Sequence, residues 1–88
     1  MGITLEFDDQ FGPAEAAQAE IAARDVLGRF EGDWDVRFFS DNGRSATYGV
    51  RVRTRNKMIV RIFDGRKELG SAIRIALGSA VAQIGLRS

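Results

Sequence analysis

The sequence predicts an α+β domain with two layers, in which two helices cover one face of a mainly antiparallel sheet. Residues 46–54 and 58–63 alternate between apolar and polar side chains, which is the pattern of strands with one buried face. Residues 13–30 and 66–85 instead repeat their apolar side chains at the spacing of a helix. We therefore expect the order β-α-β-β-β-α in one domain that spans residues 1–88.

The first half of the chain supplies a strand, a helix and a second strand. Alternating apolar residues predict the strands near residues 3–7 and 34–38. Pro13 suits the first position of the intervening helix, which we expect to reach about Phe30. The side chains predicted to face the core are Ala16, Ala19, Ala23, Val26, Leu27 and Phe30.

The register of the first hairpin follows from matching apolar faces, because a slip of one residue would turn every side chain over. Face matching favours a loop of residues 42–44, which pairs Phe38 with Tyr48. The other face of the sheet is expected to remain uncovered. Its opposed pairs in this register are Asp35 with Arg51 and Asp33 with Arg53.

The second hairpin is expected to have a three-residue loop at residues 55–57, with Asn56 or Lys57 in the left-handed conformation. The paired residues are then Thr54 with Met58, Val52 with Val60 and Val50 with Ile62. This register also sets Arg51 directly opposite Arg61 on the uncovered face. Like charges in that position destabilise a strand pair, so a carboxylate or an anionic ligand is expected nearby.

The uncovered face is the candidate nucleic-acid interface. Basic side chains neutralise phosphates and aromatic rings stack on bases, a combination that single-strand binders use on sheet surfaces. Ion pairing of two of its arginines with aspartates is the competing interpretation. The candidate binding residues are Arg37, Phe39, Arg51, Arg53, Arg55, Lys57, Arg61 and Phe63.

The last helix is apolar nearly all round, as helices buried on two sides are. One stripe, predicted to face the core, consists of Leu69, Ile73, Ala76, Leu77, Ala80 and Ile84. A monomer of 88 residues offers nothing for the opposite stripe to pack on, so we expect a homodimer or a docked partner there. The predicted interface residues are Ser71, Ile75, Gly78, Ser79, Ala82 and Leu86.

The composition excludes several kinds of chemistry. The chain has no cysteine and no histidine, which removes disulfides, thiolate and imidazole catalysis, and zinc sites built on these ligands. Asp33, Asp35 and Asp41 would suit a hard cation such as Mg²⁺, but pairing of the first two with arginines is the favoured interpretation. The glycines lack the spacing of a phosphate-binding loop. We therefore expect no enzymatic activity, no metal and no cofactor.

Charge is divided unevenly along the chain. Residues 1–42 hold ten acidic and three basic residues, whereas residues 43–88 hold two acidic and ten basic ones. This asymmetry favours a basic surface for an anionic partner, with neutralisation across the sheet as the plainer alternative. The acidic N-terminus reads as neither a signal peptide nor a membrane anchor, and Arg74 interrupts the last apolar run. We expect a cytoplasmic protein with no membrane partner.

The order of elements resembles that of the ribosome-hibernation domain and, without the first strand, that of the double-stranded RNA-binding domain. Residues 68–73, ELGSAI, resemble the opening of the last helix of a hibernation domain. Both families use lysine-rich helices for contact with phosphates, so the resemblance implies phosphate binding. The last helix departs from this pattern, because it has Arg66 and Lys67 at its start and only Arg74 after them.

Two functions follow from these observations. The first is a small non-enzymatic binding module that contacts nucleic acid through its basic and aromatic sheet face. The second is a homodimeric protein-interaction module, or a small phage-type inhibitor, that binds a partner protein and makes no contact with nucleic acid. In that case the acidic first half would face a basic partner. The sequence leaves both open.

Overall fold

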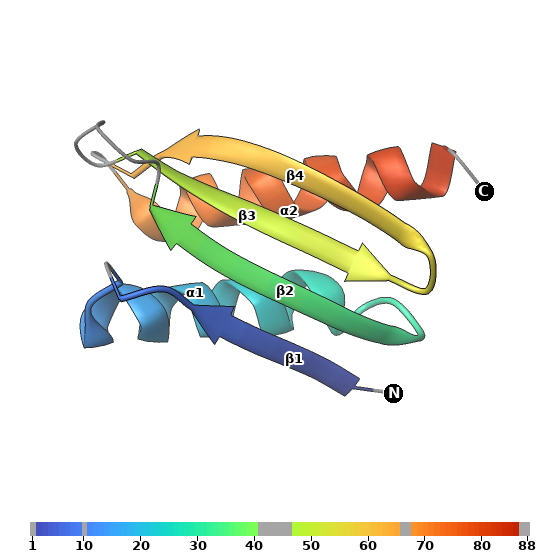
Figure 1. Ribbon diagram of the computed structural model, residues 1–88, viewed down its shortest axis with the longest axis horizontal. Coiled ribbons are helices and arrows are strands. Elements are labelled where there is room, and N and C mark those ends of the chain that lie inside the picture. Colours follow the sequence, from blue (N-terminus) through green and yellow to red (C-terminus); the bar gives the residue numbers. More distant parts are fainter. Residues whose placement is uncertain (1, 10, 41–46, 66–67, 87–88) are drawn as a thin grey trace.

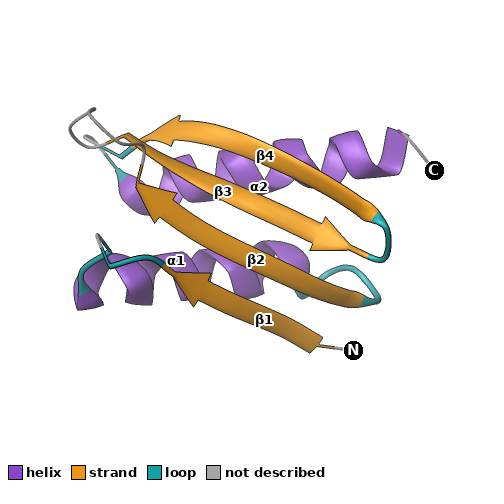
Figure 2. Ribbon diagram, in the orientation of Figure 1, coloured by secondary structure: helices purple, strands orange, loops and turns teal. Residues whose placement is uncertain are grey.

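The computed structural model describes residues 2–9, 11–40, 47–65 and 68–86. Four strands and two helices follow one another in the order β-α-β-β-β-α, and both helices pack against one face of the sheet (Figure 1, Figure 2). The predicted fold class is therefore confirmed. The elements are β1 (Gly2–Phe7), α1 (Pro13–Leu27), β2 (Asp33–Ser40), β3 (Thr47–Thr54), β4 (Lys57–Asp64) and α2 (Leu69–Leu86).

The sheet has the strand order β1-β2-β3-β4, so β1 and β4 are its two edges. Strand β1 runs parallel to β2, whereas β2, β3 and β4 are antiparallel neighbours. Helix α1 provides the crossover that two parallel neighbours need. Beyond β1, the backbone N–H of Asp8 donates to the carbonyl of Phe38 at 3.1 Å, and the Asp8 carboxylate accepts from the N–H of Ser40 at 2.8 Å. These bonds extend the parallel pair past the end of the strand.

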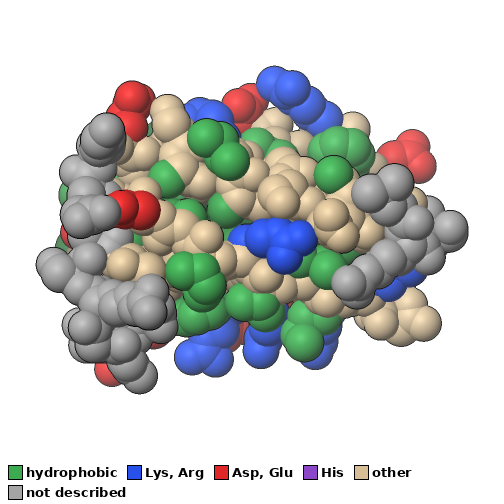
Figure 3. All heavy atoms as spheres, turned by 90° about the horizontal axis from the view of Figure 1, so that it is seen from above, with side chains coloured by type: hydrophobic (Ala, Val, Ile, Leu, Met, Phe, Trp, Pro, Cys, Tyr) green, Lys and Arg blue, Asp and Glu red, His purple; other side chains and the backbone are tan. Residues whose placement is uncertain are grey.

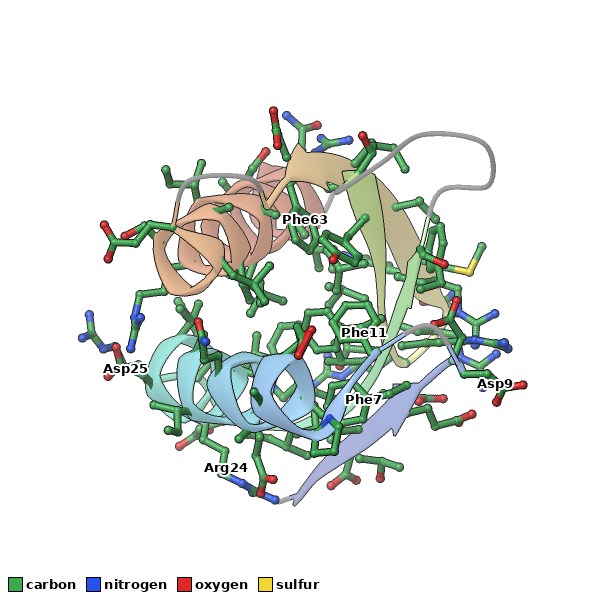
Figure 4. All side chains as sticks on the ribbon, turned by 90° about the vertical axis from the view of Figure 1, so that its left-hand side faces the viewer. Phe7, Asp9, Phe11, Arg24, Asp25 and Phe63 are labelled. Carbon is green, nitrogen blue, oxygen red and sulfur yellow. The ribbon has the colours of Figure 1, made fainter. Side chains whose placement is uncertain are left out.

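The core fills the layer between the sheet and the helices, as Figure 4 shows for Phe11 and Phe63. All six side chains that the sequence predicted for the core stripe of α2 are buried, so that prediction is confirmed. The rings of Phe7 and Phe38 stack with centroids 5.4 Å apart, and Phe11 packs against both. Neither described helix combines the length and apolar character that a bilayer crossing requires.

Helix α1 is shorter than predicted. It ends at Leu27, where the N–H of Gly28 donates to the carbonyl of Arg24 at 3.0 Å and caps the last turn. Phe30 therefore lies outside the helix and is 44% exposed, with its ring edge-on to Trp34. The prediction that Phe30 faces the core is wrong. The residues of α1 that are buried are Ala19, Ala22, Ala23 and Leu27.

The hairpin between β3 and β4 differs from the predicted one in its turn. Its loop is the two-residue turn Arg55–Asn56, and Arg55, rather than Asn56 or Lys57, has the positive φ, at 56°. Every side chain of β4 consequently lies on the face opposite to the predicted one. The observed pairs are Thr54 with Lys57, Val52 with Ile59, Arg51 with Val60 and Val50 with Arg61.

Both faces of β4 carry apolar side chains, and face matching chose the face that is exposed in the structure. One face carries Met58, Val60 and Ile62, and the apolar residues of the other face are Ile59 and Phe63. The fold buries Ile59 and Phe63, and the Phe63 ring packs against Tyr48 with centroids 5.9 Å apart. The Phe63 ring thereby joins the aromatic part of the core, and the aliphatic side chains of the other face stay outside.

The hairpin between β2 and β3 has the predicted faces but a register shifted by two residues. Phe38 pairs with Val50 instead of Tyr48, and Asp35 pairs with Arg53 instead of Arg51. The predicted loop of residues 42–44 lies outside the described residues. A shift of two keeps inward-facing side chains inward, so the core survives the error, whereas the charge pairs on the uncovered face change.

The positive φ of Arg55 predicts a gain in stability on substitution by glycine. A residue with a Cβ is destabilised by about 1–2 kcal/mol in the left-handed region. Glycine avoids this strain but loses more chain entropy on folding, which offsets part of the gain. Arg55→Gly should therefore raise the free energy of unfolding by about 1 kcal/mol in urea titrations followed by circular dichroism. Arg55→Ala is the matched control, since it loses the same guanidinium but keeps the Cβ. Equal stability of the two variants would contradict strain at this turn.

Candidate nucleic-acid interface

The sheet face turned away from both helices is not covered by any described element (Figure 4). The strand pairing arranges its side chains in rows that cross the sheet. We call this surface the open face. Its rows are Thr4, Asp35, Arg53 and Met58; Glu6, Arg37, Arg51 and Val60; and Phe39, Gly49 and Ile62.

Two arginines face each other at the centre of the open face. Arg37 of β2 pairs directly with Arg51 of β3, and opposed residues in such a pair have Cβ atoms about 5 Å apart. Neither side chain makes a hydrogen bond or ion pair with a residue that the structure describes. Glu6 lies beside Arg37 in the parallel register, and Val60 lies beside Arg51. The centre of the open face is therefore a concentration of positive charge.

Arg53 is paired with a carboxylate, although not with the one that the sequence predicted. Its Nη2 lies 3.7 Å from Oδ2 of Asp35, and the side chains are 55% and 34% exposed. The predicted pairs Asp35 with Arg51 and Asp33 with Arg53 are wrong, because the strand register is shifted by two residues. An exposed ion pair of this kind contributes at most about 1 kcal/mol. Arg53 thus remains accessible to a ligand.

Phe39 supplies an aromatic ring to the same face. Its partner across the strands is Gly49, and a Cβ built on Gly49 would collide with the Phe39 ring. The absence of a side chain at this position lets the ring lie over the bare backbone of β3. The neighbours of Gly49 across the strands are Phe39 on one side and Ile62 on the other.

Two predicted binding residues, Arg61 and Phe63, lie on the helix side of the sheet. Arg61 donates from Nε to Oγ of Ser79 in α2 at 3.1 Å and from Nη1 to the carbonyl of Val60 at 3.2 Å. Phe63 is 9% exposed and belongs to the core. Their predicted placement on the open face is wrong, as is the Arg51–Arg61 pair, because the two-residue turn inverts β4.

The remaining predicted binding residues fall into two places. Arg37, Phe39, Arg51 and Arg53 come together on the open face as predicted. Arg55 is exposed at the turn beyond this cluster. Lys57 is half-buried and lies on the same side of β4 as Arg61 and Phe63.

An apolar row along β4, at the border of the open face, was not predicted from the sequence. Met58, Val60 and Ile62 are 51%, 43% and 54% exposed, whereas they were predicted to be in the core. The signal that could have revealed them is the apolar character of both faces of β4. A two-layer fold buries only one face of an edge strand. When both faces carry apolar side chains, those of the second face stay exposed.

The predicted interface stripe of α2 points away from the core. Ile75 is 73% exposed, and Ser79 is half-buried beneath Arg61. The side chain of Leu86 is not among those that the structure describes. The other members of the stripe, all exposed, are Ser71, Gly78 and Ala82. A shallow groove of about 320 Å³ separates this stripe from β4; its lining residues are Arg61, Ile62, Phe63, Asp64, Ala72, Ile75, Ala76 and Ser79.

The acidic residues of β2 do not form a metal site with other described residues. Asp33 and Asp35 point to the open face, and no group of three or more acidic side chains within the described ranges could hold a metal ion. Asp41, the third residue of the Mg²⁺ alternative, lies outside those ranges, as do Arg66 and Lys67 at the start of the predicted last helix.

Comparison with solved structures finds two proteins with the same fold. The chain is similar to a ribosomal subunit interface protein from Coxiella burnetii, with a TM-score of 0.60 and 10% identity over 99% of this chain and 97% of that one. It is also similar to the N-terminal domain of Protein Y from Thermus thermophilus, with a TM-score of 0.67 and 14% identity over the whole of both chains. At these identities the similarity establishes the fold alone. No protein-family model and no curated protein matches the sequence.

Proposed function

We propose that the chain is a non-enzymatic module that binds RNA through its open face, with the ribosome as the partner that carries the RNA. The observation that carries this proposal is the opposed pair Arg37 and Arg51, which has no carboxylate partner among the described residues. Two like charges at this distance cost free energy in the free protein. A phosphate between them removes that cost and accepts charge-assisted hydrogen bonds from both guanidinium groups.

The surroundings of the arginine pair favour a nucleic acid over a simple anion. Arg53 and Arg55 continue the positive charge toward the end of the hairpin, so successive phosphates of one strand have successive partners. The ring of Phe39, held over Gly49, offers a surface on which a base can stack. Together they form the combination of charge and aromatic surface that single-stranded RNA requires.

The helices offer far less for phosphate binding than the open face does. Arg24 of α1 is paired with Glu20 at 3.0 Å, and Arg74 of α2 is paired with Asp25 of α1 at 3.3 Å. Arg74 is the only basic residue between Leu69 and Leu86. RNA would therefore contact the sheet of this chain, whereas the hibernation and double-stranded RNA-binding families use basic helices.

The ribosomal partner is inferred from the fold. The Coxiella burnetii protein is named for the interface between ribosomal subunits, and it shares the fold of this chain over nearly its whole length. A ribosomal partner would place the activity of this chain in the cytoplasm. It also presents a large excess of phosphates to the basic half of the sequence.

Reversing the charge of the central pair tests the proposal. Arg37→Glu with Arg51→Glu should weaken binding of a labelled single-stranded RNA by at least about tenfold and lower the slope of log K against log salt by about two. Arg24→Glu with Arg29→Glu is the control, because it changes the net charge equally on the helix side. Fluorescence anisotropy and co-sedimentation with ribosomes measure both. Equal losses from the two double variants would show that only net charge matters and would sink the proposal.

Removing the carboxylate beside Arg53 should strengthen RNA binding. Asp35→Asn releases the guanidinium 3.7 Å away, and the exposed pair is worth up to about 1 kcal/mol, which predicts an affinity gain of about two- to fivefold. Asp25→Asn is the matched control, since it removes the carboxylate that faces Arg29 and Arg74 on the helix side. The same titration by anisotropy compares the two variants. A gain of equal size in both would argue against contact of RNA with Arg53.

A second candidate function is a homodimeric protein-interaction module, which includes small inhibitors that act on another protein. The observation that favours it is Ile75, 73% exposed on the side of α2 that faces away from the core. Burying such a side chain between two copies contributes about 1.5–3 kcal/mol per residue. The interface would include the stripe predicted from the sequence.

Ile75→Lys should convert this dimer into monomers, because a charge in the middle of the apolar stripe would be buried without a partner. Light scattering at tens of micromolar protein measures the change. Ile21→Lys is the control, since Ile21 is 63% exposed on α1, away from the stripe. A wild-type protein that is already monomeric at that concentration removes this candidate.

A further inference from the structure

We propose that β4 is the seam of a homodimer, in which β4 of a second copy joins the sheet in antiparallel orientation and the two α2 helices lie side by side behind it. The inference rests on the association of two copies proposed above, and it moves the centre of the interface from α2 to the edge of the sheet. Binding of RNA is not needed for it. Three features of the edge support the proposal: its outward-pointing backbone groups, its side chains and the helix behind it.

The backbone groups of Met58, Val60 and Ile62 point away from β3. In a hairpin with a two-residue turn the closing residues, here Thr54 and Lys57, exchange backbone hydrogen bonds, and such pairs recur at every second residue. The bonds to β3 therefore fall on the odd-numbered residues of β4. The bond from Nη1 of Arg61 to the carbonyl of Val60 agrees, because that oxygen must be accessible from the edge. An edge strand whose backbone groups point away from the sheet is a template for another strand.

The exposed side chains of this edge complement themselves about Val60. A two-fold axis at Val60 sets it opposite Val60 of the second copy and sets Met58 opposite the second copy's Ile62. All three residues have outward-pointing backbone groups, so the same register also completes the hydrogen bonds of the ladder. The result is one continuous apolar row, built from side chains that are 51%, 43% and 54% exposed in the single chain.

Other registers of the two β4 strands are disfavoured, either because like charges would oppose each other or because side chains of different sheet faces would. A slip of one residue would set side chains of the open face opposite side chains of the helix side. A slip of two residues in one direction sets Arg61 opposite Arg61 of the second copy, and in the other direction it sets Lys57 opposite the second copy's Arg61. Like charges oppose each other in both cases. The register centred on Val60 instead sets Arg61 opposite the second copy's Ile59.

Helix α2 supplies the remaining surface. Stable interfaces bury about 1,200–2,000 Å² in total, which is more than the edge of one eight-residue strand provides. Helix α2 lies behind β4 (Figure 1), and the view onto this side of the molecule shows hydrophobic side chains around a basic group (Figure 3). Ile75 borders the groove between them. The small residues Ser71, Gly78 and Ala82 beside it let two helices approach closely.

Arg61 has to move for the seam to close. Its guanidinium bonds to the carbonyl of Val60, one of the groups that the second strand would use. That bond is exposed to solvent, so a backbone N–H of the second copy replaces it at little cost. The bond from Nε to Ser79 holds the side chain toward α2, on the helix side of the seam. Arg61→Ala, which frees the carbonyl, should raise the fraction of dimer at a given protein concentration.

Disulfide trapping tests the seam directly, because the chain has no cysteine of its own. Val60→Cys places two thiols opposite each other across the two-fold axis, with Cα atoms about 5.5 Å apart, within the range of a disulfide. Mild oxidation should convert most of this variant into a covalent dimer. Ile21→Cys, an exposed site on α1, is the control and should cross-link only slowly through collisions. Equal rates for the two variants would overturn the proposal.

A proline on the edge separates the seam from other dimers. Ile62→Pro removes an outward N–H and leaves the bonds to β3 intact, so edge strands tolerate it. With an unchanged circular dichroism spectrum, this variant should be monomeric in sedimentation velocity, while Ile62→Thr should remain a dimer. A dimer that survives Ile62→Pro but not Ile75→Lys overturns the seam and leaves an interface formed by α2 alone. A monomeric wild type overturns both proposals of association, and RNA binding is then judged by its own variants.

Discussion

The two-residue turn at Arg55–Asn56 is the constraint on which the rest of the molecule depends. Because strand side chains alternate, the length of this loop decides which half of β4 enters the core. The turn places Ile59 and Phe63 beneath the helices and leaves three aliphatic side chains outside. It also carries Arg61 over the edge toward α2. The strain of a positive φ at Arg55 is the cost of burying the Phe63 ring against Tyr48.

The sequence predicts which face of an element is buried only when the side chains of that face are clearly larger and more apolar than those of the other face. The core stripe of α2 was predictable because Leu69, Ile73 and Leu77 are larger than the residues opposite them, and bulk indicates burial. In β4 this relation fails. Its uniformly apolar face is the exposed one, whereas the buried face also carries Lys57 and Arg61, because the turn decides which face is buried. The register of β2 with β3 was missed for a different reason, because a shift by two residues preserves every facing and only the length of the connection distinguishes the alternatives.

The candidate site illustrates the same limit. Alternation along β2 and β3 was enough to place Arg37, Arg51 and Arg53 on one surface, since their strands bury the intervening residues. The register decides which arginine lies beside a carboxylate. Asp35 was predicted to pair with Arg51, and it pairs with Arg53. The chemically important outcome, two guanidinium groups that oppose each other, thus comes from the same two-residue shift that left the core unaffected. Surface chemistry is more sensitive to register than packing is.

The parallel pair of β1 and β2 bears on how the chain folds. The other neighbours in the sheet are consecutive strands, whereas β1 and β2 are separated in the chain by α1. Closing this longer loop costs more chain entropy before any contact is gained, so it belongs late in assembly. Two contacts stabilise β1 at the edge of the sheet: the stacking of Phe7 on Phe38, and the hydrogen bond that the Asp8 carboxylate accepts.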